Sequence, residues 1–158
     1  HADPVLDDLK SRYQQECDQL AENQQSGGED LDTTLDGPSE KSVYPLALTP
    51  GGKSATVIYN DFSCGYFGVA WCGVSGGCRF HIVVDGVIFQ GFGGRPFSIT
   101  SYGRTVVLIP KHGSYCSTSN GKTAGGAAPC YAVAVWDQRM STFASRDNPL
   151  ALKQWNPD

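Results

Sequence analysis

The sequence predicts a mainly β protein: an antiparallel sandwich or partial barrel with one N-terminal amphipathic helix, braced by disulfides. Three observations lead to this fold class. Apolar residues recur at helical spacing near the N-terminus, seven later stretches are short β-type runs, and the six cysteines are an even number. A chain of 158 residues is long enough for one ordinary domain.

The helix is expected from the start of the chain to about residue 23. Asp3-Pro4 is typical of an N-cap followed by proline in the first turn. An apolar stripe then follows at steps of three and four residues: Leu6, Leu9, Tyr13, Cys17 and Leu20. We expect the stripe to dock on the rest of the protein, and a partner-binding seam is the alternative.

Charge divides the chain into an acidic arm, residues 1–40, and a single β-rich domain, residues 41–158. The arm contains eleven acidic and two basic side chains, and the domain contains five and ten. Because opposite charges attract, we expect the arm to pack on the domain. An anionic partner for the domain is the alternative. The scattered cations form no dense basic stripe, so no nucleic-acid partner is expected.

Seven apolar runs, separated by turn residues, predict the strands. They are "SVYPLAL" (42–48), "SATVIYN" (54–60), "GYFGVAW" (65–71), "RFHIVV" (79–84), "VIFQGF" (87–92), "RTVVLIP" (104–110) and "YAVAVW" (131–136). Many short strands with frequent glycine turns favour an antiparallel sandwich or barrel.

The strongest local signal is Asp85-Gly86, a two-residue loop that selects a type I′ hairpin. The hairpin pairs Val84 with Val87, Ile82 with Phe89, and His81 with Gln90. One of its faces is expected in the core: Phe80, Ile82, Val84, Val87 and Phe89. The other is expected to be a mixed surface: Arg79, His81, Val83, Ile88, Gln90 and Phe92.

Cys72 and Cys78 bracket the glycine-rich loop "GVSGG" between two expected strands. A disulfide closing the hairpin is the simplest interpretation. A zinc site would show closer cysteine pairs, and a redox pair would show two intervening residues opening a helix. Both stay as alternatives.

The other cysteines complete a set of three disulfides. Cys116 and Cys130 bound a glycine- and alanine-rich loop, and by elimination Cys17 pairs with Cys64. Disulfides predict a secreted or periplasmic location, and the opening "HADPVLDD" is typical of a chain whose signal peptide has been removed. No apolar run approaches the ~20 residues of a membrane span.

Three fragments resemble ligand loops without matching them. "GGKS" (51–54) and "NGKT" (120–123) lack the first glycine of a phosphate loop and a following helix. In "DLDTTLDG" (30–37), Leu35 stands where a calcium loop needs glycine, and Lys41 stands where it needs glutamate. We expect a solvated acidic loop there, with a loose cation site as the alternative, and no cofactor or metal.

Candidate binding residues come from two places, and no catalytic residue is assigned. Two candidate groups are therefore named: Arg79, His81 and Gln90 on the hairpin surface, and Lys111, His112 and Tyr115 beside Cys116. No "GxSxG" or "HExxH" motif occurs. A small enzyme with His81 or His112 as general base is the alternative.

The fragments "DPVLDDL" and "CGYFGVAWCGVSGGC", with the later cysteine pair, resemble small exported proteins of alphaproteobacteria that carry a Cys-Gly-x-x-Gly-Gly-Cys-like loop. The likeness spans mainly residues 64–94. It implies a periplasmic address and nothing about mechanism.

Taken together, these features predict an exported, non-catalytic binding module, an accessory or interaction protein of the cell envelope with a protein partner. An inhibitor of an extracellular hydrolase such as lysozyme, with the loop from His112 to Cys130 as its plug, is one alternative. A small hydrolase or thiol-redox enzyme is another.

Overall fold

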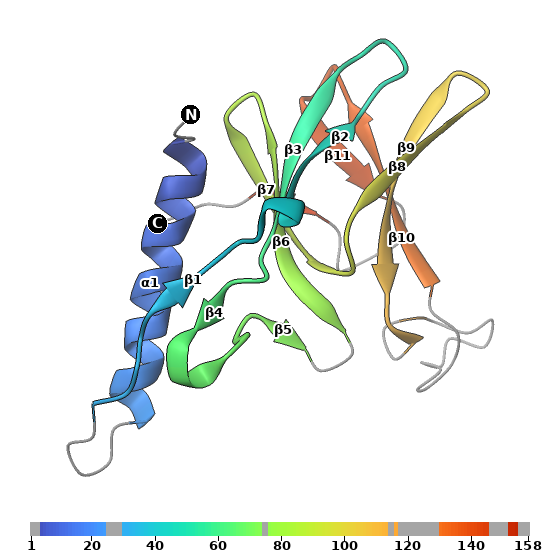
Figure 1. Ribbon diagram of the computed structural model, residues 1–158. Coiled ribbons are helices and arrows are strands. Elements are labelled where there is room, and N and C mark those ends of the chain that lie inside the picture. Colours follow the sequence, from blue (N-terminus) through green and yellow to red (C-terminus); the bar gives the residue numbers. More distant parts are fainter. Residues whose placement is uncertain are drawn as a thin grey trace.

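In the residues that it describes, a computed structural model shows one α-helix and two main sheets stacked as three layers (Figure 1). The structure describes residues 4–24, 30–73, 76–113, 116, 130–145 and 152–154. The elements in these ranges are α1 (Pro4–Gln24), β1 (Leu35–Asp36), the 3-10 helix η1 (Glu40–Ser42), β2 (Val43–Ala47), β3 (Ser54–Tyr59), β4 (Ser63–Cys64), the 3-10 helix η2 (Gly65–Phe67), β5 (Cys72–Gly73), β6 (Gly77–Val84), β7 (Val87–Gly93), β8 (Phe97–Ser101), β9 (Arg104–Lys111), β10 (Cys130–Asp137), β11 (Thr142–Ser145) and β12 (Lys153–Gln154).

All the strand pairs are antiparallel, which confirms the predicted fold class. The central sheet has the order β12-β7-β6-β3-β2, with β5 paired to β6, and the outer sheet has the order β11-β10-β9-β8. Strands β1 and β4 form a separate small sheet. The sheets stay open, and the described strands close no barrel.

The main core lies between the two large sheets. The central sheet contributes residues such as Val57, Phe80 and Phe89, and the outer sheet contributes Ile109 and Trp136. Alternate side chains of a strand point to opposite faces, so each sheet presents one face to this core. The opposite face of each sheet does not contribute to this core.

Helix α1 covers the second face of the central sheet, as the apolar stripe predicts. Leu9, Tyr13 and Cys17 are buried against a group that includes Ile58 and Phe62. The acidic arm is therefore docked through its helix. The predicted cap, Asp3, lies outside the described residues; the helix begins at Pro4.

The predicted hairpin forms β6 and β7 in the expected register. Asp85 and Gly86 have φ of 50° and 80°, as a type I′ turn requires. Val84, Ile82 and His81 pair with the predicted partners on β7. The core assignment of Val87 is wrong: it is 36% exposed, because it stands at the turn where the face leaves the core.

One predicted strand is wrong, and six strands were missed: the two-residue strands β1, β4, β5 and β12, and the longer strands β8 and β11. In the run 65–71, residues 65–67 form η2 instead, since the amides of Gly65 and Tyr66 donate to the carbonyls of Thr34 and Asp32 on a distant segment. Strands β8 and β11 are only five and four residues long, and each contains two apolar residues, which is a weak signal for a strand.

All three predicted disulfides are present: Cys17–Cys64, Cys72–Cys78 and Cys116–Cys130. The first joins α1 to the segment around β4, and the second joins β5 to β6. Three disulfides are typical of a protein from an oxidising environment. None of the helices in the described ranges combines the length and the hydropathy that a bilayer-spanning segment needs.

Candidate functional site

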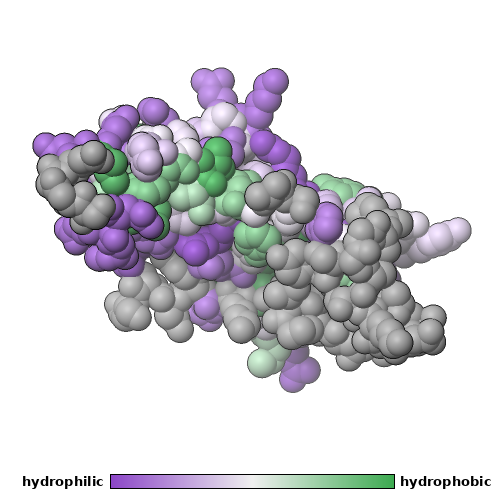
Figure 2. Space-filling view, turned by 90° about the horizontal axis from the view of Figure 1, so that it is seen from below, coloured by the Kyte–Doolittle hydropathy of each residue, from purple (hydrophilic) through white to green (hydrophobic). Residues whose placement is uncertain are grey.

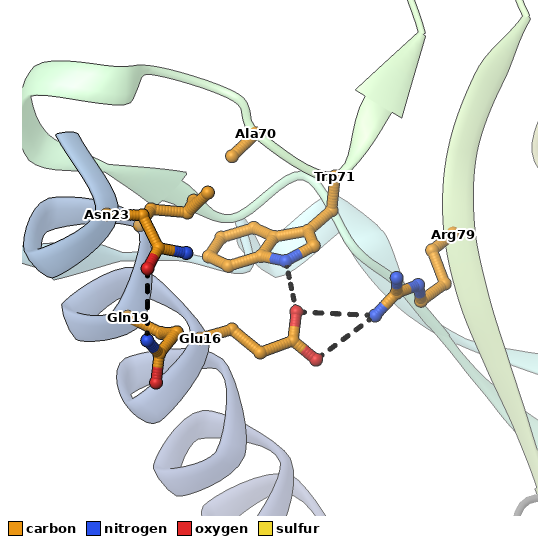
Figure 3. Close-up of a pocket in the computed structure, with 7 residues that line it drawn as sticks. Glu16, Gln19, Asn23, Ala70, Trp71 and Arg79 are labelled. Carbon is orange, nitrogen blue, oxygen red and sulfur yellow. Dashed lines mark hydrogen bonds and ion pairs between the residues drawn. The ribbon is translucent and has the colours of Figure 1, made fainter.

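A small open pocket lies between the second half of α1 and the loop that leads into β5 (Figure 3). Its volume is about 280 Å³. The helix supplies residues at helical spacing, and the loop and β6 supply the rest: Glu16, Gln19, Leu20, Asn23, Ala70, Trp71 and Arg79. Figure 2 shows the molecule from below, where hydrophobic residues lie beside hydrophilic ones on the surface.

The polar groups of the pocket bind one another. The indole N–H of Trp71 donates to Glu16 Oε2 at 2.6 Å, and Arg79 Nη1 lies 3.3 Å from Glu16 Oε1. On the helix, Gln19 donates to Asn23 at 3.3 Å. Figure 3 shows the Glu16 carboxylate between the indole and the guanidinium. The carboxylate thus links α1 to β6 and to the loop before β5. We call these contacts of Glu16 with Trp71 and Arg79 the latch, and we interpret the pocket as part of the contact that holds the helix in place.

A buried polar cluster lies deeper under the same helix. The side-chain amide of Asn60 donates through Nδ2 to Tyr13 Oη at 2.7 Å, and Tyr13 Oη lies 3.1 Å from His81 Nε2. The tautomer of His81 decides which of the two groups donates in this second contact. The guanidinium of Arg79 lies 5.8 Å from the centre of the Tyr13 ring.

Burial sets the charge state of this cluster. It raises the pKa of Tyr13 to about 12, which keeps the phenol neutral. Burial, together with the nearby positive charge of Arg79, lowers the pKa of His81 to about 3. A neutral imidazole can form this hydrogen bond with the neutral Tyr13 hydroxyl.

The three predicted binding residues of the hairpin are close together but not equally accessible. Arg79 lines the pocket, and Gln90 is half-buried opposite His81. The expectation that His81 lies on a mixed surface is wrong, since it is only 1% exposed. Helix α1 covers it, and this closure argues against a general-base role.

In the second predicted group, Lys111 is the last residue of β9 in the outer sheet, and His112 follows that strand. Lys111 is 3% exposed, and its ammonium donates to the carbonyl of Phe92 on β7. Burial lowers the pKa of this lysine. It therefore cannot act as an exposed contact as predicted. His112 is half-buried, and Tyr115 lies outside the described residues.

Two of the three fragments that resemble ligand loops lie within the described residues. Residues 51–54 form the turn from β2 into β3, where Lys53 pairs with Asp85. The carboxylate of Asp32 accepts hydrogen bonds from the hydroxyl and the amide of Thr34, which lower the pKa of Asp32. Across the described ranges, three His, Cys, Asp or Glu residues never cluster as a metal site needs. The fragment 120–123 lies outside those ranges.

A larger unassigned surface is the outer face of the sheet formed by β8, β9, β10 and β11. Five of its side chains are large, apolar and exposed: Phe97 (40%), Ile99 (49%), Tyr131 (54%), Val133 (46%) and Val135 (43%). Between them lie three half-buried apolar residues of β9: Val106, Leu108 and Pro110. We call these eight residues the outer apolar face.

The strand register makes the outer apolar face continuous. Leu108 pairs with Phe97 on one side and with Val133 on the other, and Pro110 pairs with Tyr131. The rings of Phe97 and Tyr131 meet edge to face across β9, with centroids 6.0 Å apart. In the described part of this sheet, the charged side chains on the same face stand near its end, at Arg104 and Asp137.

Sequence reasoning missed this face because apolar residues occupy both sides of β10. The buried side has Ala132, Ala134 and Trp136, whereas the exposed side has Tyr131, Val133 and Val135. An unbroken apolar run was the available signal, since antiparallel strands with one solvent-facing side usually alternate with polar residues.

Comparison of the chain with protein-family models, with curated proteins and with solved structures found no match.

Proposed function

We propose that this protein is an exported, non-catalytic protein-interaction module that makes its contact through the outer apolar face. The observation that carries the proposal is the contrast between the two sheet faces that point away from the main core. Helix α1 covers that of the central sheet, whereas the outer sheet leaves five large apolar side chains 40–54% exposed.

Exposed apolar surface of this kind is unusual on a soluble protein. Monomers rarely expose a contiguous apolar patch of more than a few hundred Å², and larger patches mark interaction sites. The centre of a protein interface is depleted in charge and enriched in aromatic residues. The outer apolar face has both properties, with Phe97 and Tyr131 as its aromatic pair.

The polar features of the molecule support recognition over chemistry. Glu16 and Arg79 bind one another in the pocket, and His81 is enclosed beneath the helix. These groups stabilise the docked arm. The disulfides hold the framework rigid, which lowers the entropy lost on binding. The periplasm is the compartment we propose, in line with the resemblance to exported alphaproteobacterial proteins.

Position-specific photo-crosslinking in the exported fraction of the source cells tests the proposal. A photoreactive phenylalanine analogue replaces Tyr131 within the face, and in a control chain it replaces Val87, which is exposed at the β6–β7 turn. We expect protein adducts from position 131 that are absent from position 87. Val133→Lys in the position-131 chain should abolish them.

Two outcomes would contradict the proposal. One is an equal yield of adducts from positions 131 and 87, which would indicate random collision. The other is an adduct from position 131 that Val133→Lys leaves unchanged, because a charge at the centre of the contact surface must weaken a real apolar interface.

A further inference from the structure

We infer that the partner seated on the outer apolar face is a second copy of this chain, which gives a two-fold symmetric dimer with the two outer sheets face to face. This inference rests on the proposed function, because it names the partner of the same surface.

The chemistry of the face restricts its partner. None of the eight residues of the outer apolar face has a charged side chain. A partner with charged groups at the contact would lose their hydration and gain no counter-charge. The partner surface must therefore be uncharged and apolar, and a second outer apolar face meets that requirement without charge repulsion.

Symmetry makes a self-contact simple to form. In a two-fold dimer, the same patch serves both subunits, so a single surface suffices. Among the described elements the outer sheet is the last layer, with α1 on the far side of the central sheet (Figure 1). Two copies can therefore approach through their outer sheets without contact between their helices.

The exposed area has the size that a dimer needs at its centre. An aromatic side chain buries roughly 150–250 Å² and an aliphatic one somewhat less, so the exposed fractions amount to on the order of 500 Å² of apolar surface. A stable interface buries about 800 Å² on each partner, with an apolar centre and a polar rim.

The tips of the two hairpins of the outer sheet can supply part of the rim. Tyr102, at the turn between β8 and β9, is 102% exposed, and Met140, between β10 and β11, is 68% exposed. Tyrosine and methionine are both enriched at interfaces. The apolar centre and this rim together approach the area of a standard interface.

Sedimentation velocity of the full, oxidised chain over a wide concentration range tests the inference. We expect a concentration-dependent dimer. Val133→Lys should raise its dissociation constant at least about tenfold, because the substitution places a charge in the buried centre. Val87→Lys, the same substitution at an exposed valine outside the face, should leave it unchanged. Val133→Thr should act in the same direction as Val133→Lys, with less disturbance of the strand.

Photo-crosslinking of the purified chain gives a measurement that does not depend on a substituted face folding well. The analogue at position 131 should yield an adduct of twice the chain mass, joined to β8, β9 or β10 of the second copy. A monomer at all concentrations overturns the inference, and so does a dimer that Val133→Lys leaves intact. An adduct within one chain also overturns it, since the protein then covers its own face.

The two proposals can fail separately. If the purified chain is monomeric but position 131 still captures a different protein in the exported fraction, the dimer is wrong and the interaction module stands. If position 131 yields neither kind of intermolecular adduct, both proposals are wrong.

Discussion

Tyr13 on α1 and His81 on β6 meet in the interior beneath the helix, with Tyr13 Oη 3.1 Å from His81 Nε2. The contact joins residues 68 positions apart in the chain. It makes the interface between the helix and the sheet partly polar, although apolar packing surrounds it. This interface is therefore sensitive to protonation.

Acidification should destabilise the protein through His81. In the unfolded chain this histidine titrates near pH 6.5, and in the folded protein its pKa is lowered to about 3. Between these values the unfolded state binds more protons, so stability is full above about pH 6.5 and falls as the pH decreases, by about 1.4 kcal/mol per unit. Urea unfolding between pH 7 and pH 5 measures this slope.

A matched pair of variants assigns the slope to one histidine. His81→Gln should flatten it, whatever the effect of this variant on stability at pH 7. His112→Gln, at a half-buried histidine beyond β9, should keep the slope of the parent protein. An unchanged slope in His81→Gln would show that another group titrates.

The latch formed by Glu16 should contribute modestly to stability. Its ion pair with Arg79 is about one-third to one-half exposed, so a double-mutant cycle should give a coupling free energy of about 0.2–1 kcal/mol that decreases with salt. Glu16→Gln keeps an acceptor for the Trp71 indole and should be milder than Glu16→Ala, by about 1 kcal/mol. Equal losses in the two variants would mean that the indole hydrogen bond contributes nothing.

The features that sequence predicts well are those fixed by local chemistry. The β6–β7 turn needs positive φ at two successive residues, and Asp85-Gly86 supplies it. The apolar stripe from Leu9 to Cys17 follows the helical period, and burial of such a stripe against the rest of the protein is favourable. The cysteine pairing followed from loop boundaries and elimination, and the structure confirms it.

The features that sequence misses depend on long-range packing. Nothing in the run 79–84 reveals that α1 lies over His81, so a buried histidine was predicted at a surface. Gly65 packs so close to Asp32 that a Cβ would lie 2.3 Å from its carbonyl oxygen, and this approach helps divert the run 65–71 from a strand. The exposed side of β10 is likewise set by long-range packing, because the opposite side, with Ala132 and Ala134, packs in the core with the central sheet.

Two of the disulfides, Cys17–Cys64 and Cys72–Cys78, should differ in their contribution to stability. Cys17–Cys64 links residues 47 positions apart, and Cys72–Cys78 links residues six apart. Loop-closure entropy predicts losses of about 4 and about 2 kcal/mol when each pair is replaced by alanine. Urea unfolding of the two double variants under non-reducing conditions tests this order, and the reverse order would show that native packing outweighs chain entropy.

Tyr59 should be more sensitive to loss of its hydroxyl than an exposed tyrosine. Its Oη donates to the carbonyl of Gly93 at 2.9 Å and accepts the amide of Cys78 at 3.0 Å, so that it bridges β6 and β7 inside the core. Tyr59→Phe leaves both backbone groups without this partner and should cost about 1–3 kcal/mol. Tyr66→Phe, at a tyrosine outside the outer apolar face that is 69% exposed, is the control and should change stability by less than about 0.5 kcal/mol. Thermal unfolding of both variants at neutral pH gives the comparison, and a Tyr59→Phe chain as stable as the control would show that water replaces the hydroxyl.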